Sequence, residues 1–168
     1  HSIFFFFVFL FINLVTTISF ASTLKEARDH LKNNDFISAN KIFFELSQKG
    51  NAEAQHELAI SFINGEGIKK NIKQGYQLLF LSADSGFILS QIKICDALVH
   101  GQKRAVENPL KKNYSKALKY CIPSANRGAI LSQANLFEMY SSKDKNQQYQ
   151  NLNKAYFWAK KAAYNKTD

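Results

Sequence analysis

The residues best suited to chemistry in this chain are four histidines, two cysteines and one short glycine-rich segment. His56-Glu57 begins like the H-E-x-x-H motif, in which two histidines on one helical face bind zinc. Position 60, where the second histidine would stand, is Ile60. His30, His56 and His100 lie far apart in the sequence and lack the spacing of metal ligands. The sequence therefore predicts no metal site, and we expect these histidines on helix surfaces.

The segment Gly65-Glu66-Gly67 is the second candidate, as a phosphate-binding loop. Such loops follow a strand and end in Gly-Lys-Ser or Gly-Lys-Thr, because backbone amides and the lysine hold the phosphates. This segment instead follows a helical pattern, so we interpret it as a helix end, where glycine readily adopts the left-handed conformation. No serine, cysteine or aspartate lies in a nucleophile motif. We therefore expect neither an enzyme nor a bound cofactor.

The elements that hold these residues repeat along the chain. The segment from Asn51 to Gly86 recurs twice, at offsets of 36 and then a further 42 residues. The matching positions are Ala54, Gln55, Leu58, Phe62 and Gly65, then Ser90, Gln91, Ile94, Leu98 and Gly101, then Ser132, Gln133, Leu136 and Tyr140. A period in the thirties with small residues at fixed places is typical of a solenoid of helical hairpins.

Helical periodicity, with only two prolines and seven glycines in the chain, favours an all-α fold of four antiparallel hairpins. The first hairpin begins near Thr23, breaks at Asn33-Asn34-Asp35 and ends near Gly50. The other three pair Ala52–Asn64 with Ile72–Ser85, Ile88–His100 with Tyr114–Asn126, and Ala129–Ser141 with Leu152–Tyr164. One hairpin cannot bury its apolar face alone, so stacking must supply the core. We expect that core to contain the aromatic residues Phe43, Phe62, Tyr76, Phe80, Tyr120, Tyr140 and Trp158.

The return helix of the last hairpin carries the most specific signature. It reads KAYFWAKKAA from Lys154 to Ala163 and resembles the K-A-x-x-W-Y-x-K-A-A pattern of Sel-one-like repeats, relatives of the tetratricopeptide repeat. The other half of that repeat, A-x-x-x-L-G-x-x-Y-x-x-G-x-G, resembles the segment Ala54–Gly67. The resemblance covers Asn51 to Asn165 and is weaker in the second unit. It implies a right-handed α-solenoid that acts as a non-catalytic adaptor, commonly in exported bacterial proteins.

The chain thus divides into a leader and four hairpins. Residues 1–21 are predicted to be a signal peptide, 22–50 a tetratricopeptide-like hairpin, and 51–86, 87–128 and 129–168 three Sel-one-like repeats. The leader is uncharged and apolar, with the small residues Ser19 and Ala21 at the −3 and −1 positions of a cleavage site. We expect export to the periplasm or the exterior, with cleavage near Ala21. The alternative is an uncleaved membrane anchor, since about 18 apolar residues just cross a bilayer.

In stacks of this kind the first helix of each hairpin lines the concave side, where we expect a protein or peptide partner to bind. Counted from Leu58, Ile94 and Leu136, the exposed candidate binding residues are His56, Ile60, Ile63, Ile92, Asp96, Val99, Ala134 and Glu138. Glu53, Leu89, Leu131 and Ser141 are expected to be exposed on the same side. The apolar members form either a peptide-binding strip or partly buried packing positions.

A formal charge of +9 comes entirely from residues after Ala21. The basic residues, among them Lys103, Arg104, Lys111 and Lys112, form either a solvated surface or an attraction for an acidic partner or anionic lipid. Nucleic acid is less favoured as a partner, because export would remove it from reach. Two other functions stay open. One is a cell-envelope hydrolase or a regulator of one, and the other is a structural segment of a longer array that self-associates through its C-terminal hairpin.

Cys95 and Cys121 lie in the two helices of the third hairpin. With His100 level with Tyr114, they are five and seven residues from the tip, a difference of about 3 Å of helical rise. Both stand where the resembled repeats have residues that face the partner helix. Export would favour a disulfide, and some secreted members of the family link the helices of one repeat in this way. We predict a Cys95–Cys121 disulfide, and the alternative is two buried free thiols.

Overall fold

The computed structural model describes residues 23–101, 109–143 and 148–165, and these residues form helices and connections without a strand. A helix over residues 23–32 comes first. It is followed by α2 (Phe36–Gln48), α3 (Ala52–Asn64), α4 (Ile72–Asp84), α5 (Ile88–His100), α6 (Tyr114–Asn126), α7 (Ile130–Ser141) and α8 (Leu152–Tyr164). The predicted all-α fold is confirmed.

Two predictions fall on residues that the structure does not describe. The predicted signal peptide, residues 1–21, lies outside the described residues, and so do Lys103 and Arg104 of the predicted basic loop. Among the helices that the structure does describe, none has both the length and the hydrophobicity needed to cross a membrane.

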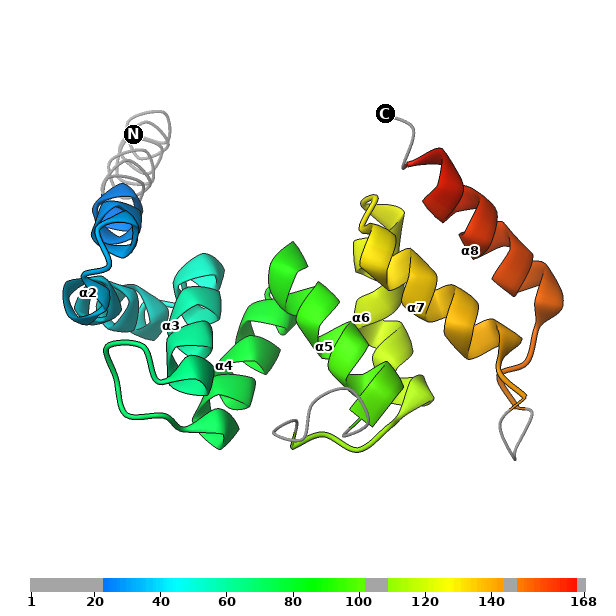
Figure 1. The fold of residues 1–168 in the computed structure, drawn as a ribbon, viewed down its shortest axis with the longest axis horizontal. Coiled ribbons are helices and arrows are strands. Elements are labelled where there is room, and N and C mark those ends of the chain that lie inside the picture. Colours follow the sequence, from blue (N-terminus) through cyan, green and yellow to red (C-terminus); the bar gives the residue numbers. More distant parts are fainter. Residues whose placement is uncertain (1–22, 102–108, 144–147, 166–168) are drawn as a thin grey trace, which may run out of the picture.

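The helices stack in chain order, and Figure 1 shows α2 near one end of the molecule and α8 at the other. Within each repeat a first helix packs against a return helix, as α3 does with α4, α5 with α6 and α7 with α8. Each return helix also packs against the first helix of the next hairpin, and α7 contacts α5 directly. This pattern of neighbour-to-neighbour packing is that of an α-solenoid.

Asparagine begins each return helix of the three repeats. The side chains of Asn71, Asn113 and Asn151 accept hydrogen bonds from backbone N–H groups three residues later, so each asparagine satisfies a donor that the helix leaves unpaired. Their own backbone N–H groups donate to carbonyls near the end of the first helix, at Phe62, Leu98 and Tyr140, each over 2.8 Å. These two bonds close every repeat in the same way, although the loop in the second repeat is longer.

Two glycines of the first repeat illustrate why this residue type is needed there. Gly65 ends α3 with a φ of +81°, which confirms the predicted helix end. Gly75 lies inside α4, where an added Cβ would stand 2.8 Å from the Ala59 carbonyl oxygen and 2.6 Å from a side-chain carbon of Ile63. The absence of a side chain therefore allows α3 and α4 to approach closely.

The core confirms most of the expected aromatic positions. Phe43, Phe62, Tyr120, Tyr140 and Trp158 are buried, whereas Tyr76 and Phe80 are partly buried against the main cluster. That cluster runs without a break from α3 to α8, and a smaller one joins the N-terminal hairpin to α3. The buried apolar residues thus form a core that continues from one repeat to the next.

Repeated glutamines hold consecutive hairpins together. The side-chain amides of Gln55, Gln91 and Gln133 donate to backbone carbonyls eight residues earlier, at Ser47, Ala83 and Ala125. Each bond joins the start of a first helix to the last turn of the preceding return helix. Because all three glutamines are buried, these bonds satisfy amide N–H groups that would otherwise be costly inside the core, although the Oε1 atoms of Gln55 and Gln91 have no hydrogen-bond partner in the described structure.

Candidate functional site

A groove of about 290 Å³ lies on the side of the molecule formed by the first helices. Its walls come from α3 and α5, its floor from Tyr76 and Leu79 of α4, and one edge from Leu131 of α7. The remaining lining residues are Ile60, Ile63, Asn64, Ile92, Lys93, Asp96 and Ala97. The lining is thus mainly apolar, with three polar side chains that can orient a ligand.

Four of the eight predicted binding residues, Ile60, Ile63, Ile92 and Asp96, come together in this groove. Two others, Ala134 and Glu138, are exposed on α7 and are not part of its lining. We therefore define the first-helix face as the groove together with the exposed side of α7. Whether these residues bind a partner stays a prediction.

The predicted exposure of His56 is wrong, because its side chain is buried against the next hairpin with only 5% of its surface accessible. Its Nδ1 atom lies 2.7 Å from Ser90 Oγ, and its ring packs against Phe87 with 5.2 Å between ring centroids. Burial, helped by the charge of Lys93, lowers the pKa of His56 to about 4. This residue is therefore a packing element between α3 and α5 rather than a surface contact.

The predicted exposure of Val99 is also wrong, since only 1% of its surface is accessible. Val99 belongs to the main core cluster. The reason lies in the stacking: α7 packs directly against α5, so a position near the end of α5 is covered by its neighbour. Helical periodicity alone identifies the side of a helix but not the element that covers it.

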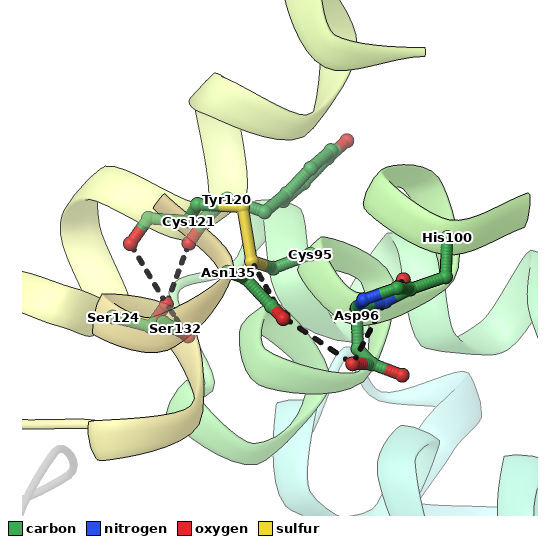
Figure 2. The surroundings of a disulfide bond; sticks show 8 residues. All are labelled: Cys95, Asp96, His100, Tyr120, Cys121, Ser124, Ser132 and Asn135. Atoms are coloured by element: carbon green, nitrogen blue, oxygen red, sulfur yellow. Dashed lines mark hydrogen bonds and ion pairs between the residues drawn. A yellow bond between two sulfur atoms is a disulfide. The ribbon is translucent and has the colours of Figure 1, made fainter. Parts of the chain in front are cut away.

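A polar cluster links α5 to α7 beside the groove (Figure 2). The His100 imidazole lies 3.2 Å from Asp96 through Nδ1 and 3.0 Å from Glu138 through Nε2. Asn135 donates from Nδ2 to Asp96 Oδ1 over 3.3 Å. Two carboxylates, from α5 and α7, thus contact one imidazole. The pKa of Tyr76, on the groove floor, is raised by burial and by the charge of Asp96.

Cys95 and Cys121 form a disulfide between α5 and α6, with their Cα atoms 4.9 Å apart, and the predicted pairing is confirmed. The bond lies next to the polar cluster, and Asn135 Nδ2 stands 3.6 Å from Cys95 Sγ (Figure 2). Asn135 thus contacts both the disulfide and Asp96. The covalent link fixes the helix that presents Asp96 to the groove.

Three histidines of the described residues make polar contacts, His30 within its own hairpin and His56 and His100 with the following hairpin. His30 contacts Asp35 over 3.0 Å, His56 contacts Ser90, and His100 contacts Asp96 and Glu138. No three His, Cys, Asp or Glu side chains in the described part of the chain are grouped so that they could hold a metal ion. His30, His56 and His100 thus take part in packing and hydrogen bonding within the described structure.

Charge is divided between the two sets of helices. The first helices α3, α5 and α7 carry four carboxylates and one lysine: Glu53, Glu57, Asp96, Glu138 and Lys93. The return helices α4, α6 and α8 carry one carboxylate and six lysines: Asp84, Lys73, Lys116, Lys119, Lys154, Lys160 and Lys161. The total charge of +9 therefore does not describe the first-helix face.

The fold is similar to that of two solved structures. One is c5321, described as a protective antigen of uropathogenic Escherichia coli with an SLR fold, at a TM-score of 0.71 and 21% identity. The other is a Sel1 repeat protein from Oxalobacter formigenes, at a TM-score of 0.69 and 16% identity. Each comparison covers 86% of this chain, which spans 30% and 58% of the length of those two proteins. A search of curated proteins gave no match.

The family itself is identified by sequence. The profile of the Sel1 repeat matches residues 52–87, 89–128 and 130–166, which together make up most of the chain. Proteins with these repeats are generally non-catalytic scaffolds that mediate protein–protein interaction. The three matched segments correspond to the three stacked hairpins from α3 to α8. The chain therefore belongs to the Sel1 repeat family, as the resemblance of its return helices predicted.

Proposed function

We propose that this protein is a non-catalytic adaptor that binds a protein or peptide partner in the groove of its first-helix face. The observation that supports this most directly is the convergence of Ile60, Ile63, Ile92 and Leu131 around one cavity. Leu131 is 43% exposed, so the rim keeps apolar surface accessible to a partner. Contiguous apolar surface of this kind, bordered by polar side chains, is typical of an interaction site.

The size of the groove favours side chains of a polypeptide over a small-molecule ligand. Ligand pockets usually have volumes of about 300–1,000 Å³ and enclose most of the ligand. The groove, at about 290 Å³, is at the lower limit of that range and has room for one or two side chains. The polar residue best placed to orient them, Asp96, already accepts a hydrogen bond from Asn135 and contacts His100. A carboxylate held in place in this way is suited to recognising a side chain of a partner.

The proposed adaptor works outside the cytoplasm, in the periplasm or after secretion. The leader sequence over residues 1–21 supports export, since it has the layout of a cleavable signal peptide. The Cys95–Cys121 disulfide supports the same compartment, because disulfides persist in oxidising environments and are rare in the cytosol. An exported protein would meet partners from the cell envelope or from the exterior.

Affinity capture from cell-envelope extract tests the groove. The bait proteins are the wild type, Ile92→Glu and Leu131→Glu, each of which places a charge in the lining. The matched control is Leu81→Glu, since Leu81 is 55% exposed on α4. We expect the groove variants to lose a partner that both the wild type and Leu81→Glu retain. If folded groove variants, verified by circular dichroism, keep every partner, the proposed function is wrong.

A second surface, on α8, supports self-association through the C-terminal hairpin. Ala83 of α4 and Ala125 of α6 are buried under the next hairpin, whereas the corresponding Ala163 of α8 is exposed. Leu152 is 67% exposed, while the corresponding Tyr114 is 8% exposed. The face of α8 that would pack in a continuing stack is thus uncovered within the described residues. We propose that a second copy of the chain covers it.

Sedimentation velocity tests self-association. The wild type should shift from monomer to dimer as its concentration rises, and added salt should favour the dimer because α8 carries three lysines. Tyr156→Lys, at a position 69% exposed on α8, should remain monomeric, whereas Leu81→Lys should behave as the wild type. If the protein is a monomer at all concentrations and salt levels, this second proposal is wrong, and the proposal for the groove is not affected.

A further inference from the structure

The charge around the groove specifies its partner further, on the basis of the proposed function. We propose that the groove binds an extended, cationic segment of another protein, in which apolar side chains alternate with lysine or arginine. The proposal is supported by the location of the carboxylates on the first helices, by the accessibility of their side chains, and by the position of the one lysine in the described lining. The apolar side chains would enter the groove, and the cationic ones would contact the carboxylates beside it.

Carboxylates lie on both sides of the apolar lining. Glu57 precedes Ile60 by about one helical turn on α3. Asp96 lies in the lining itself, and Glu138 extends from α7 toward His100. Each of the first helices α3, α5 and α7 therefore carries at least one carboxylate. A segment crossing α3, α5 and α7 would pass all of them.

These carboxylates keep accessible surface. The side chain of Glu138 is 55% exposed and that of Asp96 is 25% exposed. Both carboxylates contact the same imidazole, that of His100. The pKa of Glu57 is raised by burial and by the nearby charge of Glu53, while the charge of Arg28, which pairs with Glu53, acts in the opposite direction. Lysine or arginine side chains of a partner would therefore be attracted chiefly by Asp96 and Glu138.

Lys93 is the only basic residue in the lining that the structure describes. Its charge acts on His56 at the α3 side of the groove. Lys93 therefore opposes a cationic partner locally, while Asp96 and Glu138 attract one toward α7. Removing the charge of Lys93 should therefore strengthen binding of a cationic partner, whereas removing the charges of Asp96 and Glu138 should weaken it.

The basic residues that dominate the total charge lie elsewhere. Lys116 stands over the Phe80 ring at 4.3 Å from its centroid, and Lys119 donates to Asp84 over 2.7 Å. Both belong to the return helix α6. The acidic partner expected from the sequence would therefore contact the return helices, not the groove.

Two pools of synthetic peptides of about ten residues test the inference, a length sufficient to cross three helices about 10 Å apart. One pool alternates lysine with leucine, isoleucine or phenylalanine, and the other has glutamate at every lysine. Binding is followed by NMR titration of the isotope-labelled protein in its oxidised form. We expect the lysine pool to bind at least about tenfold more tightly, with shifts at Ile60, Ile92 and Leu131.

Three variants test which side chains cause the preference for the lysine pool over the glutamate pool. Asp96→Asn with Glu138→Gln should weaken binding of the lysine pool by about three- to tenfold, as expected for two partly exposed charge pairs. Lys93→Gln should strengthen it. The matched control Lys116→Gln, on α6, should leave it unchanged.

The outcomes separate the inference from the proposed function. Equal binding of both pools in the groove, or tighter binding of the glutamate pool, would overturn the cationic specificity and leave a groove that binds peptides. Absence of shifts at the groove with either pool would also overturn it. The proposed function is judged separately, by the envelope partners that Ile92→Glu and Leu131→Glu lose.

Discussion

The side-chain oxygens of Ser124 and Ser132 lie 2.7 Å apart, with both residues completely buried between α6 and α7. Ser82 and Ser90 repeat this contact between α4 and α5, again at 2.7 Å. The corresponding positions at the junction of α2 and α3 are Leu46 and Ala54, which belong to one apolar cluster. The stack therefore joins its hairpins by a buried hydroxyl pair at two junctions and by apolar packing at the first.

The hydroxyl pair should show energetic coupling. Ser132→Ala leaves the Ser124 hydroxyl without its partner across the junction and should lower the free energy of unfolding by about 1–2 kcal/mol. The double variant Ser124→Ala, Ser132→Ala should cost less than the sum of the single changes, by about 0.5–1 kcal/mol. Urea denaturation measures all three values. Strict additivity would mean that the two hydroxyls contribute independently.

His56 should make stability depend on pH. Its pKa is about 4 in the folded protein against an ordinary 6.5, so the unfolded chain takes up the proton first as the pH falls. Stability should therefore decline between about pH 6.5 and 4, by up to about 3 kcal/mol, and this contribution should level off below pH 4.

Urea denaturation at pH 7 and pH 4.5 checks this, with His56→Gln as the variant that lacks the titrating group. The wild type should lose more stability than His56→Gln on acidification. His30→Gln is the control, because His30 is a partly exposed residue that contacts Asp35. If the wild type and His56→Gln lose equal amounts, the burial assigned to His56 is wrong.

Loss of the disulfide should destabilise the second repeat. The bond joins residues 26 positions apart, and closing a loop of that length contributes about 3 kcal/mol in the chain-entropy description. Cys95→Ala with Cys121→Ala should lower the free energy of unfolding by that order, as should a reductant added to the wild type. The reductant should not affect the double variant. Two titratable thiols in the denatured, unreduced protein from its native host would contradict the pairing.

The asparagine caps should each contribute separately. Asn113→Ala removes the side chain that accepts from the Lys116 backbone N–H over 2.9 Å, and should cost about 1 kcal/mol. Asn113→Asp keeps an acceptor there and should retain most of the stability. Thermal unfolding compares the two variants. Equal melting temperatures for both would show that the cap oxygen makes no contribution.

Much of the fold could be predicted from the sequence, because the repeat supplies three views of one unit. The predicted bounds of α3, α5, α6 and α8 agree with the structure, since the same apolar spacing recurs in each copy. The asparagine caps escaped prediction, although the signal was present. Asn71, Asn113 and Asn151 stand at matching places just before each return helix.

The site could be predicted only in part. Ile60, Ile63, Ile92 and Asp96 follow from the register of the first helices, and the structure brings them together. Tyr76 and Leu79 of the groove come from the return helix α4, and the sequence had led us to expect Tyr76 in the core. His56 and Val99 are buried because neighbouring parts of the stack cover them. The register of a single helix does not show which of its residues are covered in this way.

Site-specific photo-crosslinking tests the central claim most directly. A photoreactive amino acid is placed at Leu131 in the groove, and at Leu81 on the outer side of α4 as the matched position. Both side chains are about half exposed, at 43% and 55%, so substitution should leave the fold intact. The account predicts a crosslinked partner in cell-envelope material from position 131 and none from position 81. Crosslinking from position 81 with none from position 131 would contradict it.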